Sequence, residues 1–334
     1  GCGAGAVSSV TVSSGQSFAT FYYKNNVSQS VTLTSDSGGY SQATKALTID
    51  PASATVLTLA GATPLTAGTC SATAYTVTTK DALGNVSNVG SNTGLTLSGA
   101  GAGGFYASAG CAAGTVSSVT VTSGQSVASF YYKNDAALAV TLAAASGGFT
   151  QGTREVTINP DSPTQLGLAG ASNLTASVCS ATPQSVNARD AFGNNSNVGS
   201  ESAVTLVATG SALIYVDSAC AGGTTGTITI ANGQSSANYY VKDTVAQAIT
   251  ITASYGGLTG TNKSITVDTS TPSKILLAGP TSVTSNVCTS GAYTLTVADA
   301  ADNPTNVTGN STITLSTGNG MFYVYSGCSN SSSS

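Results

Sequence analysis

The chain has 334 residues, of which only 7% are charged, and it contains neither histidine nor tryptophan. Nine lysines and arginines stand against 13 aspartates and glutamates, so the net charge of −4 excludes the basic surface that binding to nucleic-acid phosphates requires. Because 40% of the residues are hydrophobic, a solvated disordered chain is also excluded, and we expect a folded, acidic, all-β protein.

The sequence gives no indication of a membrane-spanning or targeting segment. No apolar stretch approaches the roughly 20 residues that a membrane helix needs. The first ten residues, GCGAGAVSSV, lack a basic region followed by an apolar run. We therefore expect no transmembrane segment, and any signal peptide was removed or lies outside this sequence.

Seven cysteines reveal an internal repeat. Their spacings alternate between 68 and 41 residues, with 40 for the last, so the period is 109, 109 and then 108 residues. A repeat of this length has the size of one autonomous domain rather than of a solenoid unit. The cysteines that define it are Cys2, Cys70, Cys111, Cys179, Cys220, Cys288 and Cys328.

Short segments of alternating apolar and polar residues recur in every period, as expected for strands that place one face on a core. No segment shows helical spacing over three turns. Seven or more strands in each repeat, separated by Gly, Asn or Ser, indicate tandem immunoglobulin-like β-sandwiches of about 109 residues, with a small barrel as the alternative. The clearest strand segments are 10–12, 31–33, 119–121, 140–142, 228–230 and 249–251.

Prolines mark the boundaries between the repeats. Pro51, Pro160 and Pro272 each stand between the last strand of one repeat and the first strand of the next. Linkers that are short and contain proline restrict bending between domains. We predict two complete domains, 51–159 and 160–268.

The two remaining segments are each half a domain. Residues 1–50 align with the second half of a repeat, and residues 269–334 align with the first half followed by a Ser-rich tail. A half sandwich would expose an apolar face and unpaired strand edges. Each end therefore needs a partner. The chain either forms a head-to-tail homopolymer by strand complementation, or is part of a longer tandem array.

The cysteine periodicity predicts one disulfide within each repeat: Cys70–Cys111, Cys179–Cys220 and Cys288–Cys328. The spacing and the lack of histidine argue against zinc and redox catalysis, and such bridges place the chain in an extracellular, oxidising environment. Cys2 has no counterpart of Cys70 in the chain and is predicted to be unpaired or to form an intermolecular bridge.

A second recurring motif is the turn Asp81-Ala-Leu-Gly-Asn85, repeated as Asp190-Ala-Phe-Gly-Asn194 and, with the glycine lost at Asp302, as residues 299–303. Its oxygens make Asp81, Asn85, Asp190 and Asn194 weak calcium candidates, but calcium takes 6 to 8 oxygens. We favour a turn in which the aspartate bonds local backbone and a glycine supplies a positive φ.

The ionisable residues do not suggest an enzyme. Histidine, the usual general base, is absent, and Glu155 and Glu201 are the only glutamates. We predict no catalytic residue, no bound metal and no cofactor. A Lys–Asn isopeptide crosslink would need a buried acid beside Lys24, Lys133 or Lys242.

Two further features have a structural and a functional interpretation. The aromatic segments 21–24, 130–133 and 239–242 could form a binding strip, but their alternation favours packing in the core. Glycosylation is left open, because the abundance of Asn, Ser and Thr alone could produce the acceptor motifs. These motifs begin at Asn26, Asn85, Asn173, Asn194, Asn262, Asn306, Asn310 and Asn330.

In the Asp-Ala-Leu-Gly-Asn turn, the Phe-Tyr-Tyr-Lys strand and the first strands that end at Gly61, Gly170 and Gly279, the repeats resemble bacterial immunoglobulin-like (Big-type) domains. Such domains occur in tandem in adhesins and in invasin-like or intimin-like surface proteins. The resemblance implies a bacterial extracellular stalk or fibre whose domains act as spacers, and no binding residue of the family can be transferred. The disulfide in each repeat departs from many family members.

From these features we predict a structural protein. It would be a subunit or segment of an extracellular bacterial filament, assembled end to end with itself. The alternative is an adhesin stalk on the cell surface whose loops contact glycans or cells.

Overall fold

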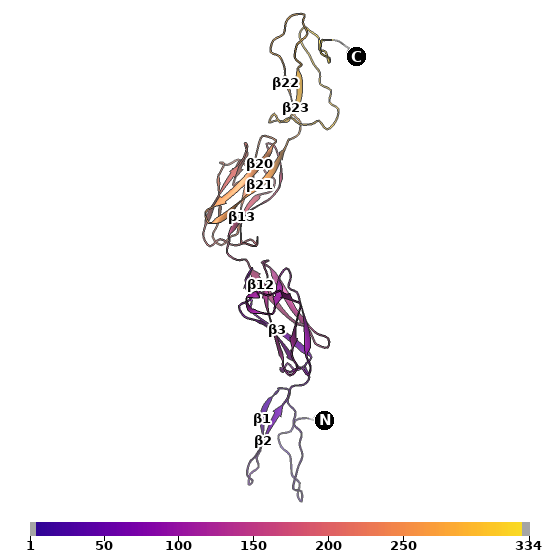
Figure 1. Ribbon diagram of the computed structural model, residues 1–334, viewed down its shortest axis with the longest axis vertical. Helices are drawn as coiled ribbons and strands as arrows, with labels where there is room; N and C mark the ends of the chain where they lie inside the picture. The colour runs from indigo at the N-terminus through magenta and orange to yellow at the C-terminus, as the bar shows by residue number, and fades with distance from the viewer. Residues whose placement is uncertain (1–4, 329–334) are drawn as a thin grey trace. The chain divides into compact units, whose positions relative to one another are not determined.

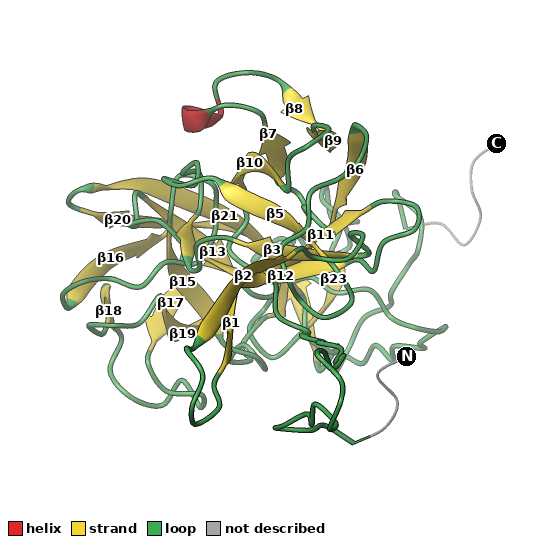
Figure 2. Cartoon of the chain, turned by 90° about the horizontal axis from the view of Figure 1, so that it is seen from below, coloured by secondary structure: helices red, strands yellow, loops and turns green. Residues whose placement is uncertain are grey.

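The computed structural model describes residues 5–328, so Cys2 and the terminal serines lie outside the described residues. The chain divides into two compact units, Gly1–Pro160 and Asp161–Ser334. Strands supply the regular structure, and the one helical element of the described range is a 3-10 turn at Ala109–Cys111 (Figure 2). Within this range no helix is long and apolar enough to cross a membrane. The prediction of an all-β protein is confirmed.

The first unit contains a sandwich of two five-stranded sheets (Figure 1). One sheet has the order β3 (Val56–Ala60), β5 (Tyr75–Lys80), β10 (Val127–Lys133), β7 (Gly104–Tyr106) and β8 (Thr115–Val116). The other has β4 (Leu65–Thr66), β12 (Gly152–Asn159), β11 (Ala139–Ala145), β6 (Thr93–Ser98) and β9 (Ser118–Val121). The successive strands β3, β5, β10 and β7 correspond to strands A, B, E and D of an immunoglobulin-type sandwich, and β12, β11 and β6 correspond to G, F and C. Neither sheet closes into a barrel.

Aromatic side chains fill the centre of this sandwich. Phe130 and Tyr132 alternate with outward-facing residues on β10 and are fully buried, which confirms packing rather than a binding strip for this segment. Phe130 stacks on Tyr75 with ring centroids 5.6 Å apart, and Phe105 meets Phe130 edge-on at 5.2 Å. Such pairs add to the free energy gained from burying the rings themselves.

The second unit contains a sandwich with the same succession of strands. Its two sheets touch at one parallel pair, Gln165 with Thr259, so the strands form one continuous path whose ends do not meet. The strands are β13 (Gln165–Ala169), β14 (Asn173–Thr175), β15 (Gln184–Arg189), β16 (Ser202–Ala208), β17 (Leu213–Tyr215), β18 (Thr227–Ile230), β19 (Ser236–Lys242), β20 (Ala248–Tyr255) and β21 (Leu258–Asp268).

In the end segments, the described residues form only strand pairs that are local in sequence. β1 (Gln29–Ser35) pairs with β2 (Ala43–Ile49), and β22 (Lys274–Ala278) pairs with β23 (Thr294–Ala298). The strand predicted at 10–12 is not formed. Its counterpart β9 pairs with β6, and the corresponding residues here, 311–316, belong to the other unit. Alternation therefore predicted a strand for which the described residues show no pairing.

A glycine at the end of the first strand lets the B strand approach closely. A Cβ on Gly61 would lie 2.0 Å from the ring of Tyr75, and one on Gly279 would lie 2.3 Å from Tyr293. In the second sandwich Gln184 replaces the tyrosine, and a Cβ on Gly170 would meet its amide at 2.4 Å. Each of these glycines therefore makes room for the side chain beside it.

The replacement Gly61→Ala should destabilise the first sandwich by about 1–3 kcal/mol, because the new methyl group overlaps the buried ring of Tyr75. Denaturant unfolding measures this change. Gly90→Ala, whose Cβ would meet nothing within 4 Å, is the control. Equal stabilities for the two variants would contradict the steric argument.

Candidate functional site

The N-terminal segment exposes apolar side chains whose counterparts are buried in the complete sandwiches. Phe21 is 58% exposed, whereas Phe130, one period later, is 0% exposed. The same contrast separates Val12 from Val121. The hairpin β1–β2 keeps the register of β11–β12, so these two strands are paired as in the first sandwich.

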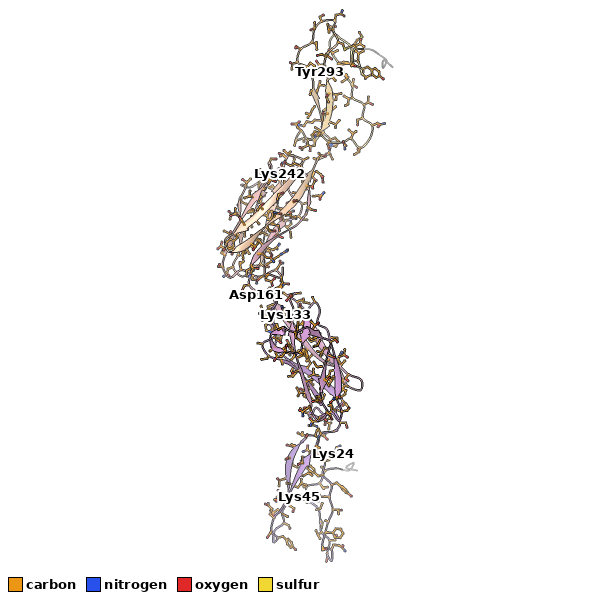
Figure 3. All side chains as sticks on the ribbon, viewed as in Figure 1. Lys24, Lys45, Lys133, Asp161, Lys242 and Tyr293 are labelled. Carbon is orange, nitrogen blue, oxygen red and sulfur yellow. A yellow bond between two sulfur atoms is a disulfide. The ribbon has the colours of Figure 1, made fainter. Side chains whose placement is uncertain are left out.

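The C-terminal segment shows the same contrast on the other half of the sandwich. Leu277 is 65% exposed, whereas Leu59 is 7% exposed in the first sandwich. Leu295 and Tyr293 (the latter labelled in Figure 3) are also exposed, although their counterparts on β5, Val77 and Tyr75, are fully buried. Apolar side chains at these repeat positions are therefore exposed in both end segments and buried in the two sandwiches.

The recurring Asp-Xaa-Xaa-Xaa-Asn motif forms a polar turn. The Asp81 carboxylate is almost completely buried and accepts four hydrogen bonds. One oxygen accepts the N–H groups of Leu83 and Asn85, both at 2.9 Å. The other accepts the Asn85 side-chain amide at 2.9 Å and the N–H of Ala52 at 3.1 Å. The hydrogen bond from the Asn85 side chain is the main reason that the pKa of Asp81 is lowered.

The other two copies have the same geometry. Asp190 and Asp299 are fully buried and accept the corresponding N–H groups. Burial alone would raise the pKa of Asp299, but hydrogen bonds from Asn303 and from backbone N–H groups outweigh it and lower the pKa to about 2. At Gly84 the turn has a φ of 89°, and Asp302 adopts a φ of 70° at the same position.

This geometry bears on the calcium candidates. Asp81 directs its carboxylate towards N–H donors, and the Asn85 amide nitrogen points at that carboxylate. Asp190 and Asn194 are arranged alike. Calcium needs 6 to 8 oxygens, and within residues 5–328 no group of three or more His, Cys, Asp or Glu side chains could hold a metal. The arrangement favours the structural turn.

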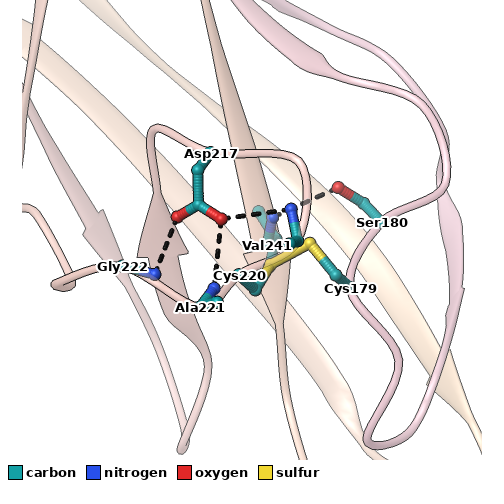
Figure 4. The surroundings of a disulfide bond; sticks show 8 residues. Cys179, Ser180, Asp217, Cys220, Ala221, Gly222 and Val241 are labelled. Atoms are coloured by element: carbon teal, nitrogen blue, oxygen red, sulfur yellow. Dashed lines mark hydrogen bonds between the residues drawn. A yellow bond between two sulfur atoms is a disulfide. The ribbon is translucent and has the colours of Figure 1, made fainter.

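One disulfide is present in each period: Cys70–Cys111, Cys179–Cys220 and Cys288–Cys328. The first two tie the loop before the B strand to the loop after the D strand. In the second sandwich the Asp217 carboxylate organises this loop by accepting the N–H groups of Ala221 and Gly222 (Figure 4). These backbone hydrogen bonds lower the pKa of Asp217. Closing a loop of 41 residues stabilises the fold by about 4 kcal/mol in the chain-entropy model.

No catalytic constellation is brought together among the described residues. A shallow groove beside the Asp81 turn is lined by residues such as Pro51, Val86 and Phe149, and none of its lining residues is ionisable. The candidate lysines for an isopeptide bond, Lys24, Lys133 and Lys242 (Figure 3), are not buried.

No protein-family model matches the sequence, and no curated protein matches it. Among solved structures, the chain is similar to FdeC, an adhesin of Escherichia coli, with 18% identity over 76% of this chain and 75% of that chain, at a TM-score of 0.34. It is similar to invasin, a bacterial integrin-binding protein, with 14% identity over 75% of this chain and 47% of that chain, at a TM-score of 0.30.

A glycosyl hydrolase family 2 member from Bacteroides cellulosilyticus is similar with 12% identity over 58% of this chain, at a TM-score of 0.29. The chain spans only 23% of the length of that hydrolase. Because all three TM-scores lie below 0.5, the immunoglobulin-type assignment rests on the strand order of this chain's own sheets.

Removal of the second bridge by Cys179→Ala with Cys220→Ala should lower the free energy of unfolding of the second sandwich by about 4 kcal/mol, because the unfolded chain regains the freedom of a 41-residue loop. Denaturant unfolding followed by hydrogen exchange resolves the two sandwiches. The matched pair Cys70→Ala with Cys111→Ala should affect the first sandwich instead. An unchanged second sandwich would show that this bridge contributes little.

The Asp299 carboxylate should make the folded state pH-dependent. Its ordinary pKa is 3.8 and its folded value is about 2, so ionised Asp299 stabilises the folded state above about pH 4, and this contribution is lost as the pH falls towards 2. The carbon chemical shift of the carboxyl group, followed by NMR, measures the folded midpoint. A midpoint near 4 would contradict the hydrogen-bonded turn.

Proposed function

We propose that this protein is a structural segment of an extracellular stalk or fibre, in which immunoglobulin-type sandwiches act as spacers. Its end segments, 1–50 and 269–334, are half domains that become one complete domain when they meet. The observation that carries the proposal is that residues exposed on these segments occupy the repeat positions that form the core of the complete sandwiches.

The strand register supports complementation between the two halves. In the first sandwich Phe130 on β10 lies opposite Tyr75 on β5, and in the second Tyr239 lies opposite Gln184. The repeat period transfers this pairing to Phe21 and Tyr293 in the end segments. Both side chains are at least half exposed, so pairing would bury an aromatic pair of the kind seen in the first core.

The edge strands support the same proposal. In the first sandwich Leu95 on β6 pairs with Val119 on β9. The period places Ile313 opposite Val10, and both belong to segments that form no strand. Complementation would convert these two segments into a strand pair joined by backbone hydrogen bonds.

The disulfides fit a position outside the cell. Disulfides persist in oxidising compartments, and one occurs in every period. The complementary half domain comes from a neighbouring copy in a homopolymer or from the next repeat of a longer chain. The described residues bring no catalytic group together, so we propose a mechanical role rather than an enzymatic one.

A cysteine pair placed across the proposed junction tests the register. Ser129 pairs with Thr76 in the first sandwich, which transfers to Thr20 and Thr294. A chain carrying Thr20→Cys and Thr294→Cys should form end-to-end disulfide-linked oligomers, identified by mass spectrometry of the linked peptides. The register-shifted pair Thr20→Cys with Thr296→Cys is the control and should not crosslink.

Charge placed in the apolar face should block the same association. Phe21→Asp should abolish the end-to-end oligomers seen by sedimentation, whereas Tyr22→Asp should not, because the counterpart of Tyr22 faces outward on β10. Oligomers that persist in Phe21→Asp would overturn complementation. Binding of purified glycans by monomeric chains would instead support an adhesin stalk that acts through its loops.

A further inference from the structure

The polar turn beginning at Asp81 also contacts the repeat that precedes it. The Asn85 side-chain amide donates from Nδ2 to the carbonyl of Asn26 at 2.9 Å and accepts the N–H of Ser28 at Oδ1 at 3.0 Å. The residues it contacts lie 57 and 59 positions earlier in the chain. One side-chain amide thus bonds two alternate main-chain groups of the neighbouring repeat, as the backbone of a paired strand would.

The same arrangement recurs in the other unit. The Asn303 amide donates to the carbonyl of Thr244 at 2.8 Å and accepts the N–H of Ala246 at 2.9 Å. The two partner loops have different sequences, Asn-Val-Ser at 26–28 and Thr-Val-Ala at 244–246. Both loops are shaped by a preceding side chain, since Asn25 and Asp243 each accept the N–H two residues later.

The linker between the repeats is fixed by the same turn. Asp81 accepts the N–H of Ala52 at 3.1 Å, and Ser87 Oγ donates to the carbonyl of Ala52 at 2.6 Å. In the other unit, Asp299 and Thr305 bind the N–H and the carbonyl of Ser270 in the same way. Both polar groups of one linker residue are therefore satisfied by the following repeat.

We propose that the Asp-Xaa-Xaa-Xaa-Asn turn is an inter-repeat clamp whose partner is the main chain of the preceding repeat. The buried aspartate orients the asparagine amide, and the amide holds residues 26–28 or 244–246 of the preceding repeat. Because the turn bonds only backbone atoms of that loop, it tolerates different side chains there. The motif thus acts between repeats as well as within its own.

Hydrogen exchange of the intact chain tests the clamp. In Asn85→Ala, the Ser28 amide should exchange about tenfold faster, as expected for the loss of the hydrogen bond that Asn85 accepts from it, while the amides of β3 and β5 exchange as before. Asn303→Ala should act in the same way on Ala246 and provides an independent second test.

Matched controls occur at the exposed asparagines three positions after each clamp residue. Asn88→Ala and Asn306→Ala should leave the exchange rates of the Ser28 and Ala246 amides unchanged. Unaltered exchange at Ser28 in Asn85→Ala would overturn the proposal. Equally faster exchange of the amides throughout β3 and β5 would also overturn it, because the asparagine would then act only on the stability of its own sandwich. Slower exchange of the Ser28 or Ala246 amide upon addition of calcium would overturn it as well, because it would identify a metal site.

Discussion

A sheet with one apolar face is stable in water only when another sheet covers that face, and the organisation of this chain follows from that constraint. In both complete sandwiches two sheets enclose a continuous core. In the end segments the apolar side chains at the same repeat positions are exposed. Among the described residues, the distinctive surfaces are therefore the exposed apolar faces of the two end segments.

The individual sandwich is stabilised by several local arrangements around that core. A glycine at the end of the first strand lets the B strand approach, and a basic side chain, Arg154 or Lys263, donates to the carbonyl of that glycine. In the second sandwich Lys263 also donates to the buried amide oxygen of Gln184. Gln184 occupies the repeat position of Tyr75, and there a polar contact with Lys263 stands in place of the aromatic contact of Tyr75 with Phe130.

The sequence alone was sufficient for the features that depend on periodicity. Cysteine spacing predicted the pairing of Cys179 with Cys220, and alternation predicted which face of β10 carries Phe130. Alternation failed at 10–12, because a strand also needs a neighbour with which to pair. The contacts of Asn85 with the preceding repeat were not predicted, since an amide in a turn motif gives no sign of a partner 59 residues away.

The proposed clamp binds main-chain atoms of the preceding repeat, so it does not depend on the side chains of that loop. Asn85 and Asn303 bind loops that share little sequence, so a duplicated repeat would join its neighbour without compensating substitutions. In the proposed stalk, unequal recombination between such repeats would then change the number of domains while preserving contacts like those of Asn85 and Asn303. Length is therefore the property of this architecture that selection can adjust with the fewest mutations.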